Sequence, residues 1–345
     1  MLNKFNGLVA DYFTGNLFSV FEKSLFFPKT GEAVCFRHAG RIKRAYELWT
    51  EVILNSGKNG GIPEKKKIEP YTGNNTAVLS LRKYLEENLK PFLLGAYIHG
   101  SLASGEEIDY SDFDSFLIFG DKGFINEKTL STVCFRTLEA QKILYQYDAL
   151  QHHGFFVLTE NDLKYFCQDK FPLVLFDEAK SLFEDKGLII SLNIQPSSGE
   201  EIKVFQRMAR TLKEKLEQGK YPRNYYQLKL LLSQMMLLPV LYLQAKGMYV
   251  SKKDSFSLAK RDFSSQEWEI MERVSLIREQ WDYTPSKAFV FFQKKIKNPF
   301  FSAVYQKKIG EKISERIRSY LTHDFYASML KLVSSMEIKL RSVFS

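Results

Sequence analysis

The chain has 345 residues, which is too long for one small core and long enough for two compact domains. Hydrophobic residues make up 45% and charged residues 26% of it, with 10 prolines and 19 glycines, and this composition excludes a disordered or collagen-like chain. The formal net charge of +9 leaves a nucleotide, a nucleic acid and an acidic protein open as partners.

The charge is unevenly distributed along the chain. Residues 1–200 contain 22 Lys and Arg against 26 Asp and Glu, a balance of −4, and residues 201–345 contain 27 against 14, a balance of +13. An acidic half can gather metal ions while a basic half attracts anions. The alternative is that the basic residues only solvate the outer faces of helices.

The cysteines and the apolar segments bear on the compartment. Cys35, Cys134 and Cys167 are an odd number without metal-ligand spacing, which argues against a disulfide framework and indicates a reducing, cytoplasmic compartment. Residues 1–19 are amphipathic, unlike a secretory signal. The apolar run Leu228–Leu243 is shorter than the roughly 20 residues of a membrane span, so we expect a buried helix there and no membrane association.

Residues 1–75 are expected to form an N-terminal helical extension. Apolar residues recur at helical spacing in two stretches: Leu8, Tyr12, Leu17 and Phe21 in the first, and Ala45, Trp49 and Ile53 in the second. The polar segment Asn55–Pro63 and the charged run Glu64–Lys67 that follows it predict a solvated loop.

Residues 76–192 are expected to form a small domain with a sheet. Helical spacing predicts helices over Thr76–Leu89 and Asn126–Tyr145. Short apolar runs predict covered strands: Phe92–Ile98, Ser115–Phe119 and Phe155–Leu158. Strand, helix and strand in this order form a small α/β unit.

Residues 200–345 are expected to form a helical bundle. Proline, serine and glycine gather in Asn193–Gly199, which predicts a linker. Helical patterns then follow in five segments: Glu201–Gln218, Tyr225–Lys246, Ser265–Trp281, Pro285–Lys297 and Ser302–Ser345. The predicted fold class is α+β, with a small mixed-sheet domain followed by an all-α bundle.

Two features between the first two predicted strands suit phosphate chemistry. Gly100 and Ser101 stand at a helix start, where the glycine lets the backbone approach an anion and the N–H groups and hydroxyl can donate to it. Asp112 and Asp114 are two residues apart, so on a regular strand their carboxylates lie on one face. Two such acids repel each other unless a cation lies between them, and hard oxygen ligands favour Mg²⁺. Either feature alone is common on protein surfaces, but the ordered pair favours phosphoryl or nucleotidyl transfer.

This ordered set resembles the nucleotidyltransferase signature of the DNA polymerase β superfamily over about Leu93–Leu163. The resemblance implies nucleotide-binding residues and metal ligands: Gly100, Ser101 and Ser111 for the nucleotide, and Asp112 and Asp114 for one or two Mg²⁺ ions. It also implies a nucleoside triphosphate as substrate, with ATP as the first choice.

The superfamily commonly uses a third carboxylate on a later strand. The segment Asp148–Leu158 resembles the corresponding strand of aminoglycoside adenylyltransferases, but Gln151 stands where the glutamate would be. Gln151 cannot take a proton, although its amide oxygen could contact a cation. His153 would share its strand face and could act as general base or metal ligand. The adjacent His152 is the weaker candidate, and both histidines could instead be structural.

A second resemblance lies in the C-terminal half. Leu238–Gly247 and Val250–Phe256 are similar to the helix–turn segment of the same adenylyltransferases, in which a lysine after the glycine contacts the nucleotide phosphates. Lys252 matches that lysine best and Lys253 next. A lysine is a suitable point charge for a phosphate, but this segment could also be an exposed helix start.

Together these features predict a Mg²⁺-dependent nucleotidyltransferase with its active cleft between the two parts. It would move a nucleoside monophosphate onto an acceptor hydroxyl and release pyrophosphate. A small-molecule acceptor is favoured, and a protein or RNA acceptor is the alternative suggested by the basic C-terminal half. A nucleotide sensor without turnover is the rival class, suggested by Gln151.

Overall fold

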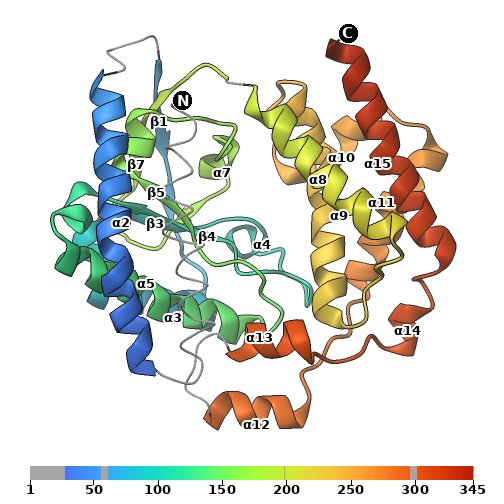
Figure 1. Cartoon of the computed structure of the whole chain (residues 1–345), viewed down its shortest axis with the longest axis horizontal. Coiled ribbons are helices and arrows are strands. Elements are labelled where there is room, and N and C mark those ends of the chain that lie inside the picture. The colour runs from blue at the N-terminus through green and yellow to red at the C-terminus, as the bar shows by residue number, and fades with distance from the viewer. Residues whose placement is uncertain (1–27, 56–60, 198, 296–300, 345) are drawn as a thin grey trace.

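The computed structural model describes residues 28–55, 61–197, 199–295 and 301–344. It is a mixed α+β structure with a small mixed sheet in the N-terminal part and a helical C-terminal region (Figure 1). The fold class predicted from the sequence is confirmed at this level. The predicted helical spacing at Leu8, Tyr12, Leu17 and Phe21, residues 1–19 and part of the predicted loop before Pro63 lie outside the described residues.

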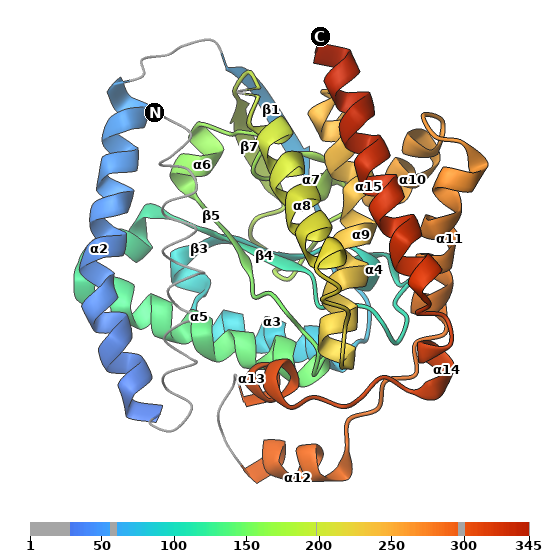
Figure 2. The same ribbon diagram turned by 45° about the vertical axis from the view of Figure 1, so that its right-hand side comes forward.

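Three long helices cover one face of the sheet (Figure 2). They are α2 (Pro28–Asn55), α3 (Thr76–Asn88) and α5 (Glu127–Tyr147). Both α2 and α3 pack against α5, and they share one core with the strands. Trp49 of α2 and Leu138 of α5 are fully buried in that core. The described part of the predicted N-terminal extension therefore forms a layer of the sheet domain.

The main sheet has five strands in the order β2-β6-β3-β4-β5. Their bounds are β2 (Glu69–Pro70), β3 (Leu93–Ile98), β4 (Ser115–Phe119), β5 (Phe156–Thr159) and β6 (Lys180–Ser181). Strand β4 is antiparallel to β3 and parallel to β5, and α5 connects β4 to β5. All five residues of β4 are buried, as the apolar run predicts for a central strand covered on both faces.

The expected solvated loop at Glu64–Lys67 is wrong, because these residues belong to a strand. Strand β1 (Ile62–Lys67) pairs antiparallel with β7 (Ile189–Ile194) in a separate two-stranded sheet. Lysines have low strand propensity, but here the backbone pairs with a segment over 120 positions away, and Lys66 forms a 2.8 Å ion pair with Asp177. Strand β7 also continues to Ile194, inside the predicted linker.

Short helices connect these elements. They are the 3₁₀ turns η1 (Lys90–Phe92) and η2 (Asp121–Phe124) and the helices α4 (Ser101–Ser104), α6 (Glu160–Lys164) and α7 (Val174–Asp177). The second face of the sheet is covered by aromatic side chains, among them Phe166 and Phe176, which pack on Tyr97 and Phe116 of the strands.

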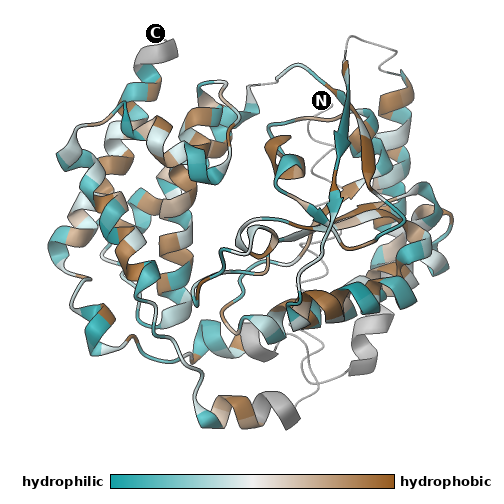
Figure 3. Cartoon of the chain, turned by 180° about the vertical axis from the view of Figure 1, so that it is seen from behind, coloured by the Kyte–Doolittle hydropathy of each residue, from teal (hydrophilic) through white to brown (hydrophobic). Residues whose placement is uncertain are grey.

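The named elements of the C-terminal region are all helices within its described residues. Its helices are α8 (Glu200–Glu217), α9 (Tyr225–Ala245), α10 (Lys252–Lys260), α11 (Ser265–Glu279), α12 (Lys287–Lys295), α13 (Phe301–Lys308), α14 (Glu315–Arg318) and α15 (His323–Phe344). Hydropathy colouring shows hydrophobic and hydrophilic residues alternating around most of these helices (Figure 3), as expected where one face meets a core.

Helix α9 lies at the centre of this region and contacts α8, α10, α11 and α15. Among the described helices it is the one with the length and composition of a membrane span, but 78% of its most apolar window is buried inside the protein. That burial is what the sequence predicts for a core helix.

The single helical segment expected over Ser302–Ser345 is divided into α13, α14 and α15. At Gly310 the chain packs so closely that an added Cβ would lie 2.4 Å from the carbonyl oxygen of Gln306. Lys312 then pairs with Asn224 ahead of α9, and the Ser314 hydroxyl caps α14. These contacts and the cap of α14 interrupt the single helix that the apolar pattern predicts.

Candidate functional site

The two predicted metal-ligating aspartates lie between α4 and β4, and Asp112 contacts Lys229 of the helical region from there. The expectation that both aspartates lie on a strand is wrong. Strand β4 begins at Ser115, so Asp114 is one residue and Asp112 three residues before it. The chain is nevertheless extended there, because the His99 N–H donates to the Asp114 carbonyl at 3.1 Å and continues the pairing of β3 with β4. The side chains are only 14% and 31% exposed, respectively.

Gly100 brings its backbone against the Asp114 carboxylate. Its φ of 65° lies in the left-handed region, and an added Cβ would be 3.0 Å from Asp114 Oδ2. Both features require glycine. Ser101 starts α4 immediately afterwards, and the first N–H groups of a helix have no acceptor within it. The structure thus joins the predicted phosphate-binding turn to one predicted metal ligand.

Gln151 supports the segment between the two aspartates. The Phe113 N–H donates to Gln151 Oε1 at 3.0 Å, and Gln151 Nε2 donates to the Phe113 carbonyl at 3.2 Å and the His153 carbonyl at 3.0 Å. The side chain is fully buried. The predicted contact of its amide oxygen with a cation is therefore replaced by a positioning role, in which Gln151 fixes the spacing of the two carboxylates.

The two adjacent histidines contact different aspartates. His153 Nε2 lies 3.3 Å from Asp114 Oδ1, and His152 Nδ1 lies 3.9 Å from Asp112 Oδ1. The segment that carries them is irregular, since only Phe156–Thr159 of the predicted later strand is a strand. The structure brings both histidines to the aspartate pair, including His152, which was the weaker candidate.

These contacts separate the pKa values of the histidines. Burial favours the neutral form of His153, but the hydrogen bond to Asp114 and its negative charge prevail and raise the pKa of His153 to about 9. Burial lowers the pKa of His152 to about 4 against the attraction of Asp112. Burial also opposes ionisation of Asp114, yet the His153 hydrogen bond and the charge of His99 hold the pKa of that carboxyl well below its usual range. Near neutral pH His153 is therefore a cation paired with Asp114, which does not suit the predicted role of a free general base.

Lys229 completes the site and was missed in the sequence. It projects from α9, and its ammonium group lies 2.7 Å from Asp112 Oδ1 and 2.7 Å from Asp148 Oδ2. Its side chain is 1% exposed. Burial opposes its charge, but Asp148 and Asp112 outweigh burial and raise the pKa of Lys229. The available signal was a single charge within the apolar run of α9, because a lysine buried there requires a partner.

The two carboxylates that share Lys229 differ in acidity. Burial raises the pKa of Asp148 to about 6 against the attraction of Lys229, and the negative charge of Asp112 adds to the rise. Burial also opposes ionisation of Asp112, but the positive charge of Lys229 prevails and lowers the pKa of Asp112. Asp148 is therefore a third carboxylate at the site, held beside Asp112 through one shared ammonium group.

Tyr110 links this cluster to the helical region. Its hydroxyl donates to the Lys229 carbonyl at 2.9 Å and lies 2.8 Å from Ser233 Oγ. The ring packs edge-on against Trp281, and the Arg278 guanidinium lies 4.7 Å from its centre. Tyr110 belongs to the core of the helical region although the chain places it two residues before Asp112. The loop that carries the aspartates is thus anchored on both sides.

The other predicted nucleotide-binding residues divide into two groups. The ammonium group of Lys252, at the start of α10, interacts electrostatically with Asp114 and Asp112. Lys253 instead forms a 2.9 Å ion pair with Glu106, and both of these side chains are exposed. The Ser111 hydroxyl accepts from the Ile108 N–H at 3.0 Å and closes a local turn. The structure therefore brings Lys252 to the site and gives Lys253 and Ser111 other partners.

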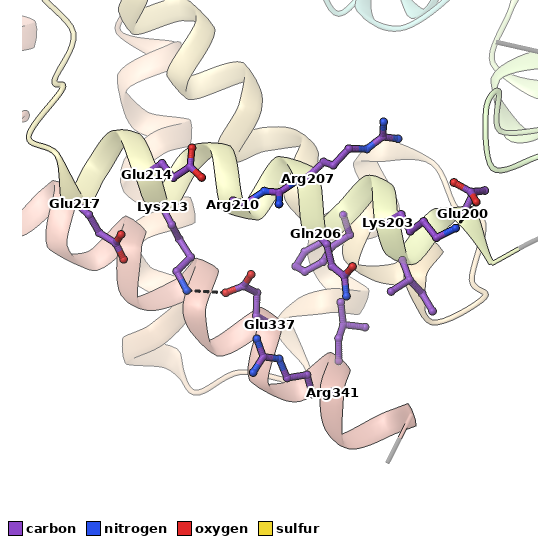
Figure 4. A pocket seen from close by; sticks show the side chains of 13 residues that line it. Glu200, Lys203, Gln206, Arg207, Arg210, Lys213, Glu214, Glu217, Glu337 and Arg341 are labelled. Carbon is purple, nitrogen blue, oxygen red and sulfur yellow. Dashed lines mark hydrogen bonds and ion pairs between the residues drawn. The ribbon is translucent and has the colours of Figure 1, made fainter. Parts of the chain in front are cut away.

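A groove of about 940 Å³ lies away from the aspartates, between α8 and α15. Figure 4 shows its charged lining, which includes Arg207, Arg210 and Arg341 and the ion pair of Lys213 with Glu337. None of its lining residues belongs to the site around Asp112. Basic and acidic side chains alternate there, so the groove does not favour one kind of ligand.

Metal-ligating side chains gather at the aspartate site. Within the part of the chain that the structure describes, Asp112, His152 and His153 form the one group of three such residues whose ligand atoms all lie within 4.8 Å of one another. A carboxylate and two imidazoles can hold a divalent ion. The cluster therefore fits a metal ion.

No family model, curated protein or solved structure matches this chain. The interpretation of the site rests on the chain's own residues.

Proposed function

We propose that the chain is a metal-dependent nucleotidyltransferase, built on a sheet domain of the kind found in the DNA polymerase β superfamily. The observation that carries the proposal is the contact of the Gly100 turn with Asp114, beside Asp112. A backbone turn suited to phosphate and two carboxylates suited to a dication adjoin one another, as transfer from a nucleoside triphosphate requires. Lys252 supports it, because a cation from the helical region interacts with the same carboxylates.

The residues divide the work as follows. The N–H groups at Ser101 and the Lys252 ammonium group bind and orient the phosphates, while Asp112 and Asp114 hold the metal ion. When bound, such an ion neutralises charge on the attacking and leaving oxygens. Gln151 fixes the distance between the two aspartates through the Phe113 backbone. Catalysis would therefore depend mainly on positioning and electrostatics.

The reaction is transfer of a nucleoside monophosphate, from ATP as first choice, to an acceptor hydroxyl with release of pyrophosphate. A small molecule remains the favoured acceptor, and the charge of +13 in residues 201–345 keeps an RNA or protein acceptor as the alternative.

A nucleotide sensor without turnover is the second candidate, and two contacts favour it. Lys229 already neutralises Asp112, and His153 already pairs with Asp114. In addition, Gln151 occupies the position of the third acid that the resemblance predicts. A chain with these features could bind a nucleotide without transferring it.

Pyrophosphate release separates the two candidates. The protein is incubated with labelled ATP, GTP, CTP and UTP in Mg²⁺ or Mn²⁺, with and without candidate hydroxyl acceptors. We expect turnover that falls at least about 100-fold in Asp112→Asn and in Asp114→Asn, because each change removes a ligand of the ion that stabilises the transition state. The matched control is Asp177→Asn, which alters a surface ion pair with Lys66.

The lysines provide a second comparison. Lys252→Met is expected to raise KM for the nucleotide about 10-fold, whereas Lys253→Met leaves it within about twofold because that lysine pairs with Glu106. Nucleotide binding without pyrophosphate under any acceptor would replace the enzyme with the sensor. Salt-sensitive retention on RNA would favour an RNA acceptor.

A further inference from the structure

Three of the five histidines in the chain gather at the aspartate pair. His152 and His153 face Asp112 and Asp114, and His99 interacts electrostatically with Asp114. Magnesium sites in proteins are made of oxygen ligands and water, so this concentration of imidazoles is not what a site for Mg²⁺ alone requires.

Two of these imidazoles carry a buried nitrogen without a hydrogen-bond partner. His99 Nε2 and His152 Nδ1 are both shielded from solvent and bonded to no donor or acceptor within the described residues. Leaving a buried polar atom unpaired costs about 1–3 kcal/mol. An imidazole nitrogen beside a carboxylate can meet this requirement by binding a metal ion.

The distances suit an ion shared between the side chains. His152 Nδ1 and Asp112 Oδ1 are 3.9 Å apart, which is too far for a hydrogen bond. Two ligands bound at about 2.1 Å to one ion lie at most about 4.2 Å apart. All three ligand atoms of Asp112, His152 and His153 lie within 4.8 Å of one another, so small side-chain rotations bring them around one ion.

From this arrangement we propose that Asp112, His152 and His153 bind a divalent transition-metal ion, of the class of Mn²⁺, Co²⁺ or Zn²⁺. Imidazole ligands favour these ions over Mg²⁺, which prefers oxygen. Coordination takes the place of the proton on an imidazole nitrogen.

Lys229 limits how Asp112 takes part. Its ammonium group occupies one side of Asp112 Oδ1 at 2.7 Å and is itself held by Asp148. Asp112 Oδ1 therefore keeps only part of its acceptor capacity for an ion, and the two imidazoles supply the remaining protein ligands. The use of this ion in catalysis rests on the proposed nucleotidyl transfer, but its binding does not.

Binding is tested on the full-length chain without nucleotide, after removal of metals, with Mn²⁺ as the probe. Calorimetry compares Mn²⁺ with Mg²⁺, and pulsed electron paramagnetic resonance detects nitrogen coupled to the bound Mn²⁺. We expect Mn²⁺ to bind at least about 10-fold more tightly than Mg²⁺ and to show imidazole nitrogen couplings. His152→Ala and His153→Ala should each weaken Mn²⁺ binding at least about 10-fold, while His323→Ala, an exposed histidine on α15, leaves it unchanged.

The spectroscopic measurement uses the native chain, so it stands even where a variant folds poorly. Mn²⁺ bound without nitrogen coupling, or with an affinity equal to that of Mg²⁺, overturns the proposed ligand set. If the bound Mn²⁺ shows nitrogen coupling but no pyrophosphate is released, the proposed function is wrong and the metal site stands. If turnover persists in both histidine variants and their Mn²⁺ affinity equals that of the native chain, the function stands and the proposed site is wrong.

Discussion

Lys229 gives the sharpest test of how the site is held together. Lys229→Met keeps most of the volume of the side chain but removes its charge, so Asp112 and Asp148 remain close together with no cation between them. Both carboxylates are nearly buried, with side chains 14% and 11% exposed. Removing one partner of a buried ion pair typically costs about 3–5 kcal/mol because the remaining charge is uncompensated.

The structure sets a ceiling on this loss, because an unpaired carboxyl can take up a proton. The ordinary pKa of Asp is 3.8. Holding one carboxyl neutral costs about 1.36 kcal/mol for each pH unit above its ordinary pKa. This cost is about 4 kcal/mol at pH 7 and about 1.6 kcal/mol at pH 5. Asp148 already bears part of this cost beside Lys229, because its pKa is about 6. We therefore expect a loss of about 3–4 kcal/mol at pH 7 and about 1–1.5 kcal/mol at pH 5.

The sign of the pH dependence follows from the direction of the shifts. In Lys229→Met the folded-state pKa values of both carboxyls are raised, so the variant is least impaired below about pH 4 and loses stability as pH rises through those values. A loss caused only by altered packing would be the same at both pH values. The measurement is urea unfolding of the native chain and the variant at each pH.

Two further variants complete the experiment. Lys229→Met combined with Asp148→Asn leaves one unpaired carboxylate instead of two, and we expect it to recover at least about 1 kcal/mol at pH 7. Lys260→Met, which removes an exposed ion pair with Glu272, is the control and should change stability by less than about 0.5 kcal/mol. A loss below about 1 kcal/mol for Lys229→Met, independent of pH, would refute the reasoning.

Three other substitutions test single contacts. Gly100→Ala should cost about 1–2 kcal/mol in urea unfolding and lower turnover, because its φ of 65° is unfavourable for alanine and the new Cβ meets Asp114; an unchanged unfolding midpoint would contradict this. Gln151→Glu should cost about 2–4 kcal/mol at pH 7 without raising turnover, since a carboxylate cannot donate to the Phe113 carbonyl; higher turnover at unchanged stability would restore Gln151 to a catalytic position. Glu267→Gln should cost about 1–2 kcal/mol at pH 7. Hydrogen bonds, the largest from a serine of α15, lower the pKa of Glu267 to about 2, so its stabilisation is complete above about pH 4.5 and should disappear as pH falls toward 2.

The sequence predicts well those elements whose stabilising residues, such as an apolar run or a helix cap, lie within the element itself. The apolar run Ser115–Phe119 appears as β4, and the helical pattern over Asn126–Tyr145 appears as α5 with an asparagine cap at its start. Strand β1 was missed because its lysines are unfavourable locally and its pairing partner, β7, is far away in the chain. Local composition carries no information about such a partner.

The site divides in the same way. The closeness of Gly100 to the aspartates could be predicted because the spacing of these residues is itself the signal. Lys229 was missed because its partner Asp148 stands 81 positions earlier, and only the fold brings the two together. The hydrogen bonds of Gln151 were missed for a related reason, since its amide is used by a backbone group 38 positions away.

The two aspartates are therefore not equivalent. Asp114 contacts Gly100 and His153, which belong to the sheet domain, and Lys252 of the helical region acts on it only electrostatically. Asp112 is paired with Lys229 of α9, and Tyr110, two residues before it, packs in the helical core. A shift of the helical region relative to the sheet would thus remove the ion-pair partner of Asp112, whereas Asp114 would keep its contacts with Gly100 and His153. Because Lys252 comes from the same helical region, the position of that region controls both the cation that neutralises Asp112 and the one available for phosphate.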